Sequence, residues 1–223
     1  MSWDAGIFDA VLFDCDGVLV DSEAITCGVL RDMFEAQGWR MTLDECMQTF
    51  VGYSVRDRRT LIESRTGQPL TEAWMAQFYQ RRDEALGQRV EAIPGIHAAV
   101  AHVAAHTGGQ IACASGADRG KLQLMLGKVG LLSHFEGRLF SGHEVGRNKP
   151  HPDVYLAAAA HLGIAPERCL VIEDTWVGVT AGRAAGATVW GYAAHGQEAE
   201  LLQAGAATTF DHMDQLPRLF PPR

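Results

Sequence analysis

Apolar residues gather along most of this chain in short continuous runs, and a pattern typical of a helix follows each run. The runs at 10–13, 111–114 and 169–172 are the clearest, because no polar position interrupts them. A continuous run of this length is typical of a strand that is covered on both faces in a parallel sheet. The repeated strand and helix pattern therefore predicts an α/β fold with a doubly wound parallel sheet.

The pattern also predicts where the elements of this fold lie. Strands are expected at 9–15, 110–115, 138–142, 168–173, 187–193 and near 207–211. Helices are expected at 95–107, 117–128, 152–162, 176–185 and 197–204.

A different pattern occupies the segment from Ser22 to Leu86, where the apolar spacing is helical and no strand is indicated. Glycines and a proline divide this segment into four predicted helices, near 22–37, 42–50, 54–66 and 71–87. Ser54 and Thr71 are the expected N-caps of the last two helices. The chain is therefore predicted to form an α/β core domain from 1–18 and 90–223, with a small helical domain, 19–89, inserted after the first strand.

Length and charge narrow the class of protein. A chain of 223 residues can build one well-buried core and a smaller inserted domain. The formal net charge of −8 argues against nucleic acid or an anionic membrane as a partner, because both bind basic surfaces. A few local cations can still hold a small phosphorylated molecule.

Cysteine usage and the N-terminus bear on the cellular compartment. The five cysteines form no CxxC pair, and we interpret them as free thiols in a reducing cytosol. The N-terminus has no basic region before an apolar stretch, and no apolar run is long enough for a membrane span. We therefore expect a cytoplasmic protein without a signal peptide or a membrane anchor.

Functional groups suited to phosphate or Mg²⁺ follow four of the apolar runs. Ligands of an open α/β sheet bind beyond the carboxyl ends of its strands, so these groups are expected to share one site. The groups are Asp14 and Asp16 after the first run, Ser115 and Gly116, Lys149, and Glu173 and Asp174. Together they predict a phosphoryl-transfer site.

The four acids of this set point to a metal. Asp14 and Asp16 are two residues apart, so both carboxylates can face one cavity at a strand end. Glu173 and Asp174 would bring two more carboxylates to a neighbouring strand end. Carboxylates this close repel one another, and Mg²⁺ bound by their oxygen atoms would relieve the repulsion. Asp174 by itself has a second interpretation, as the cap of the helix that follows it.

Ser115 and Lys149 also have structural interpretations beside the functional ones. Ser115 precedes the helix expected from 117, so it could serve as an N-cap, and even there it would lie at a helix N-terminus that stabilises an anion. Lys149 precedes Pro150, which favours an extended backbone, while Pro152 suits the first turn of the next helix. Its ammonium would then be offered from a stiff loop, although it could also be a solvated loop charge.

These motifs resemble those of the haloacid dehalogenase superfamily of phosphohydrolases. The likeness is to the subgroup with a helical cap inserted after the first strand, which includes sugar-phosphate phosphatases and β-phosphoglucomutase. The matching segments are Asp14-Cys15-Asp16-Gly17, Ser115, Lys149-Pro150, and Val171-Ile172-Glu173-Asp174 with Gly178 and Ala185-Gly186.

The resemblance implies a Rossmann-like core and a role for each motif residue. By this likeness Asp14 is the nucleophile and Asp16 the general acid and base, and Ser115 and Lys149 hold the transferring phosphoryl group. Mg²⁺ would be bound by Asp14, the main-chain carbonyl of Asp16, and Asp174, with Glu173 close by.

Departures from the motifs of other family members favour a phosphatase. Asp16 is present, whereas dehalogenases lack this second acid. Residues 1–120 contain no lysine, which excludes a cap lysine of the phosphonoacetaldehyde hydrolase type. The histidine and cap arginine typical of the mutases are replaced by Thr26 and Val55, although Arg56 could substitute for the arginine after a small shift.

We therefore expect a Mg²⁺-dependent phosphatase that hydrolyses a small phosphorylated metabolite, a sugar phosphate above all, through an aspartyl-phosphate intermediate. The alternatives are a mutase similar to β-phosphoglucomutase and a phosphosugar-binding protein without turnover. The residues expected at the substrate are Gly52, Tyr53, Ser54, Arg56 and Gly116. We expect a monomer, with a homodimer as the alternative.

Overall fold

The computed structural model describes residues 8–220, and the chain divides into two compact units. One unit combines the chain up to Val20 with the chain from Ala92 onward, and the other is the segment Asp21–Glu91. The chain passes between them at two short strands, β2 (Val20–Asp21) and β3 (Glu91–Ala92), which pair with each other. Each unit is described by itself below.

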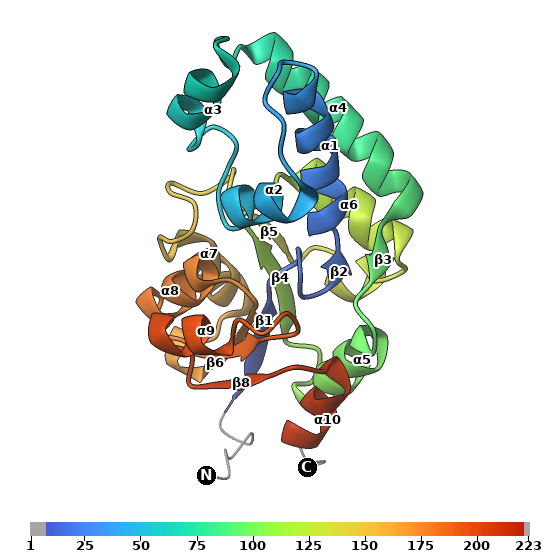
Figure 1. Ribbon diagram of the computed structural model, residues 1–223. Coiled ribbons are helices and arrows are strands. Elements are labelled where there is room, and N and C mark those ends of the chain that lie inside the picture. The colour runs from blue at the N-terminus through green and yellow to red at the C-terminus, as the bar shows by residue number, and fades with distance from the viewer. Residues whose placement is uncertain (1–7, 221–223) are drawn as a thin grey trace. The chain divides into compact units, whose positions relative to one another are not determined.

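The first unit is built on a six-stranded sheet with the order β5-β4-β1-β6-β7-β8, in which all the pairings are parallel (Figure 1). The strands are β1 (Ala10–Phe13), β4 (Ile111–Ser115), β5 (Leu139–Ser141), β6 (Cys169–Glu173), β7 (Thr188–Tyr192) and β8 (Thr208–Phe210). The order reverses at β1, which pairs with β4 on one side and β6 on the other. This is the predicted doubly wound sheet, and the prediction is confirmed.

Helices of this unit lie close to where the apolar pattern predicts them. They are α5 (Ile96–His106), α6 (Arg119–Lys128), α7 (Asp153–Leu162), α8 (Trp176–Ala184) and α9 (Glu198–Ala204). A short helix that the pattern did not predict, α10 (Leu216–Leu219), follows the last strand. Short 3₁₀ helices lie at Leu132–Phe135, Pro166–Arg168 and Met213–Gln215.

Apolar packing on both faces explains why β1 has no polar position. Successive side chains of a strand point to opposite faces of the sheet. Leu12 belongs to a buried cluster that includes residues of α7, α8 and α9. On the other face, Phe13 makes an edge-to-face contact with Phe135, with ring centroids 6.1 Å apart. Because both faces are covered, every residue of β1 is buried.

The second unit is helical and is formed by α1 (Glu23–Glu35), α2 (Leu43–Phe50), α3 (Arg59–Thr66) and α4 (Glu72–Arg89). Its core centres on Phe34, whose ring lies 4.9 Å from Trp39, 5.3 Å from Phe50 and 5.5 Å from Trp74, measured between centroids. Thr71 caps α4 as predicted, because its side chain accepts a hydrogen bond from the Trp74 N–H at 3.2 Å.

The prediction that Ser54 caps a helix is wrong. The segment 55–58 forms turns, and α3 begins only at Arg59, after Arg58 as its N-cap. Ser54 instead exchanges two hydrogen bonds with Asp57, each 3.2 Å long. This local pairing resembles an N-cap in sequence but closes a turn.

No helix among residues 8–220 is long and apolar enough to cross a membrane.

Candidate active site

The first part of the site is the loop after β1. The Asp14 N–H continues the sheet by donating to the Ile172 carbonyl at 3.0 Å, which leaves the carboxylate buried at the strand end. Gly17 then turns the chain with a φ of +76°, and a Cβ there would lie 2.0 Å from an Asp174 carboxylate oxygen. The left-handed conformation and this close approach both require glycine. The loop of β1 and the end of β6 are therefore packed directly against each other.

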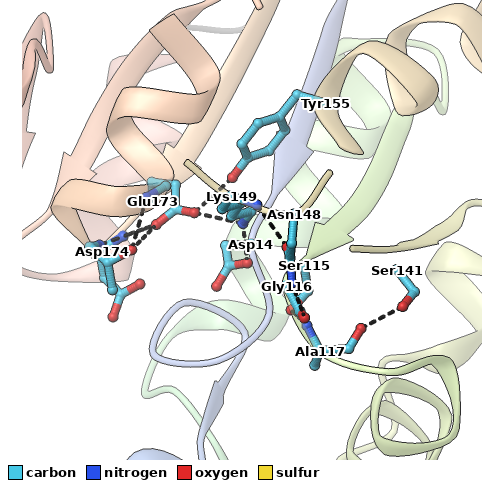
Figure 2. Close-up of polar contacts among 12 residues, drawn as sticks. Asp14, Ser115, Gly116, Ala117, Ser141, Asn148, Lys149, Tyr155, Glu173 and Asp174 are labelled. Carbon is cyan, nitrogen blue, oxygen red and sulfur yellow. Dashed lines mark hydrogen bonds and ion pairs between the residues drawn. The ribbon is translucent and has the colours of Figure 1, made fainter. Parts of the chain in front are cut away.

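Lys149 joins the two strand ends (Figure 2). Its Nζ lies 2.6 Å from an Asp14 oxygen and 2.7 Å from Oε1 of Glu173, and its side chain is almost fully buried. The alternative of a solvated loop charge is therefore wrong.

Glu173 is held from several directions. Its Oε1 accepts hydrogen bonds from Lys149 and from the Tyr155 hydroxyl, at 2.7 and 2.8 Å. Its Oε2 accepts from the N–H groups of Asp174 and Thr175 and from the Thr175 hydroxyl. Glu173 thus anchors Lys149 and the backbone after β6 at the same time.

The carboxylates of Asp14, Glu173 and Asp174 form a buried cluster in which one oxygen from each lies within 4.8 Å of the others. These three residues could hold a metal ion, because Mg²⁺ favours oxygen ligands from carboxylates. Asp174 does not cap α8, since Thr175 is the N-cap and its hydroxyl accepts from the Gly178 N–H at 3.2 Å. The capping interpretation of Asp174 is therefore wrong.

Burial and charge set the ionisation of the central pair. Burial raises the pKa of Asp14 to about 7; the Lys149 ammonium opposes the rise, and the carboxylates of Glu173 and Asp16 add to it. Burial by itself lowers the pKa of Lys149, but the Asp14 and Glu173 carboxylates raise it well above its usual value. Lys149 is therefore a fixed positive charge, while the ionised form of Asp14 is disfavoured in this site and would be stabilised by a further cation.

Ser115 and Gly116 lie at the end of β4, next to the loop that carries Lys149 (Figure 2). The Ser115 hydroxyl accepts from the Ala117 N–H at 3.2 Å. The alternative interpretation of Ser115 as a helix cap is wrong, because α6 begins at Arg119 and its N-cap is Asp118. Asn148, which the sequence reasoning missed, donates to the Gly116 carbonyl at 2.9 Å and so ties the lysine loop to β4.

The residues expected at the substrate fall into two groups. Gly116 belongs to the α/β unit, whereas Gly52, Tyr53, Ser54 and Arg56 belong to the helical unit. Arg56 makes two hydrogen bonds of 2.6 Å to the carboxylate of Glu72, and this pairing is local to the helical unit. Tyr53 is 39% exposed, and the Arg58 guanidinium carbon lies 3.6 Å from the centroid of its ring.

Two further residues of the α/β unit were missed by sequence reasoning. Tyr155 of α7 is buried, and its ring lies 4.7 Å from the Lys149 ammonium. Lys121 of α6 places its Nζ 2.6 Å from an oxygen of Asp16. Neither could be recognised from the sequence, because a tyrosine or a lysine inside a helical pattern does not indicate a functional role. The small number of lysines in the chain was the one feature that could have pointed to Lys121.

The fold and this arrangement of strand-end groups define the class of protein. The chain belongs to the haloacid dehalogenase-like hydrolase family, whose model matches residues 8–186. The expectation of a hydrolase of this superfamily is therefore confirmed.

Individual relatives agree with the family. The chain is 30% identical to a 6-phosphogluconate phosphatase of Escherichia coli over 216 residues, which cover 96% of each chain. A haloacid dehalogenase family hydrolase of Deinococcus radiodurans, solved with bound phosphate and sodium, is 34% identical; the match covers 98% of this chain and 100% of that one, with a TM-score of 0.80. A haloacid dehalogenase-like protein of unknown function from Agrobacterium tumefaciens is 31% identical and has a TM-score of 0.82, with coverage of 95% and 97%.

Proposed function

We propose that this protein is a Mg²⁺-dependent phosphatase that hydrolyses a small phosphorylated sugar or sugar acid through a phosphoaspartate on Asp14. The observation that carries the proposal is the contact of Lys149 with both Asp14 and Glu173, in a cluster that also contains Asp174. A buried lysine between strand-end carboxylates is suited to a group that brings further negative charge to the site, as a phosphoryl group does.

The proposed reaction has two steps. An Asp14 oxygen attacks phosphorus, the bond to the ester oxygen breaks, and Asp16 donates its proton to the departing alkoxide. Water then attacks the phosphoaspartate and Asp16 takes up its proton, which releases phosphate and restores both carboxyl groups. Lys149 neutralises charge on the phosphoryl oxygens, while Ser115 and the Gly116 backbone hold them in place.

The acidic cluster fits a divalent cation. Three carboxylates within 4.8 Å of one another outnumber the one ammonium that Lys149 contributes. Asp14 and Asp174 would hold Mg²⁺ together with the main-chain carbonyl of Asp16, and Glu173 would lie close by. When bound, Mg²⁺ supplies positive charge that stabilises the phosphoryl oxygens.

The substrate class follows from the relatives. The chain aligns with a 6-phosphogluconate phosphatase along 96% of its length, which supports a phosphorylated sugar or sugar acid as the substrate. Specificity is assigned to the helical domain of 19–89 and the chemistry to the core of 1–18 and 90–223. Gly52, Tyr53, Ser54 and Arg56 remain the proposed substrate residues of the helical domain, and Arg56 would have to exchange Glu72 for the substrate.

The test is phosphate release by the purified protein from an aryl phosphate and from a panel of phosphorylated metabolites, with Mg²⁺ and after exhaustive chelation. The panel includes hexose phosphates, 6-phosphogluconate, phosphoglycolate and nucleotides. We expect release that depends on Mg²⁺ and is fastest with one sugar or sugar-acid phosphate. Full activity after chelation would contradict the metal assignment, and an isomerised sugar phosphate in place of free phosphate would identify a mutase.

A further inference from the structure

Lys121 occupies an unusual position for a lysine. It lies in the first turn of α6, where its own N–H donates to the capping Asp118 carboxylate at 2.9 Å. Its side chain is only 10% exposed, and its Nζ reaches Asp16, which is 105 residues away in the sequence, at 2.6 Å. The contact therefore joins a helix of the fold to the proposed acid and base.

This position is costly for a positive charge. The N-terminal end of a helix carries a partial positive charge, so a cation in the first turn is disfavoured. Burial of the ammonium adds a desolvation cost, and the attraction within a buried ion pair often does no more than offset such a cost. Stability alone therefore gives no reason for a lysine here.

We propose that Lys121 is a positioning residue for Asp16, an inference that rests on the phosphatase proposed above. Its ammonium holds one carboxylate oxygen of Asp16 and so limits rotation of the carboxyl group. The restraint keeps Asp16 aligned with the oxygen of the leaving group during proton transfer, a step whose rate depends on geometry.

The two buried lysines then have separate tasks. Lys149 contacts the nucleophile Asp14, whereas Lys121 contacts Asp16. Removing Lys149 would impair phosphoryl transfer from every substrate. Removing Lys121 would impair only the steps in which Asp16 transfers a proton. Formation of the phosphoenzyme requires this proton transfer only when the substrate has a poor leaving group.

The experiment measures phosphoenzyme formation by rapid quench with saturating Mg²⁺, using 4-nitrophenyl phosphate and the best sugar phosphate of the panel. 4-Nitrophenolate departs without a proton, whereas a sugar alkoxide requires one. The variants are Lys121→Met, Lys121→Gln and Lys121→Arg. Lys128→Met is the matched control, since Lys128 is an exposed lysine in the last turn of the same helix.

We expect Lys121→Met to slow phosphoenzyme formation from the sugar phosphate by about tenfold or more, a part of what general acid catalysis provides. Formation from 4-nitrophenyl phosphate should change by less than about threefold, and the phosphoenzyme should then accumulate because Asp16 also activates water. Lys121→Arg should recover most of the rate, and Lys128→Met should behave as wild type. Lys121→Gln should repeat the pattern if Lys121→Met fails to fold.

Equal losses with both substrates would overturn the proposal, as would a change confined to KM or no change at all. A wild-type protein that forms no phosphoenzyme and releases no phosphate from either substrate would instead refute the phosphatase itself, and that result does not depend on any variant.

Discussion

The α/β unit and the helical unit hold their candidate functional residues in different ways. In the α/β unit, Lys149 is buried and contacts Asp14, which lies 135 residues away in the sequence. In the helical unit, Arg56 is exposed and contacts Glu72, which lies 16 residues away. A site built from distant, buried partners tolerates little change, whereas exposed and locally held residues can change without disturbing the fold. The comparison is consistent with chemistry in the first unit and substrate choice in the second.

The largest expected effect is the loss of turnover in Asp14→Asn. An amide cannot replace a carboxylate as the nucleophile, so kcat should fall by about 1,000-fold or more. Steady-state phosphate release measures the loss, and circular dichroism checks the fold. Asp211→Asn, at an exposed aspartate of the same unit, should keep wild-type activity. Substantial turnover by purified Asp14→Asn would remove Asp14 from its role.

The second prediction compares one helical glycine from each unit. A Cβ at Gly178 in α8 would lie 1.6 Å from Oε1 of Glu173, whereas a Cβ at Gly28 in α1 would meet nothing within 4 Å. Gly178→Ala should lower the free energy of unfolding by about 2 kcal/mol or more, because it displaces a hydrogen-bonded buried carboxylate.

Gly28→Ala is the matched control for this change. It should raise the free energy of unfolding by about 0.5–1 kcal/mol, since alanine favours a helix over glycine. Urea denaturation measures both variants. A neutral Gly178→Ala would show that Glu173 is not held as tightly as its hydrogen bonds suggest.

The third prediction concerns pH in the presence of a chelator. The pKa of Asp14 is raised from 3.8 to about 7, so the folded state binds a proton more tightly than the unfolded state. This contribution to stability is fully present below pH 3.8 and is lost as pH rises through about 7. Titration of Asp14 should therefore lower the free energy of unfolding as pH rises between these values, by at most about 1.4 kcal/mol per pH unit.

Thermal unfolding of wild type and of Asp14→Asn from pH 4 to pH 8 measures this loss of stability. The variant lacks the titrating group, so its stability relative to wild type should improve as pH rises. Asp211→Asn should follow the wild-type curve. Parallel curves for wild type and Asp14→Asn would show that Asp14 does not titrate in this range.

The smallest expected effect lies in the helical unit. Tyr53→Ala should lower kcat/KM for the preferred sugar phosphate by about tenfold, roughly 1.4 kcal/mol, and leave a small aryl phosphate nearly unchanged. Glu72→Gln, which weakens the hold on Arg56, should not lower activity if Arg56 serves the substrate. Equal losses of Tyr53→Ala on both substrates would mean that this loop supports the fold or the chemistry instead of substrate choice.

Local patterns in the sequence determined much of the fold. Every strand of the sheet and most of the helices lie within a few residues of their predicted positions, because an uninterrupted apolar run has few other ways to be buried. The strand-end positions of Asp14, Ser115, Glu173 and Asp174 followed from the same runs. Each of these predictions depended only on residues that are neighbours in the chain.

Only the tertiary structure decided which side chains are partners. Ser115 and Asp174 both precede a helix, yet Asp118 and Thr175 are the caps, because the geometry of each strand-to-helix turn selects one residue among several suited to the role. The pairing of Lys121 with Asp16 spans 105 residues and depends on where α6 packs. No local pattern marks such a contact, since its energy arises from burial and charge that exist only once the sheet and its helices have assembled.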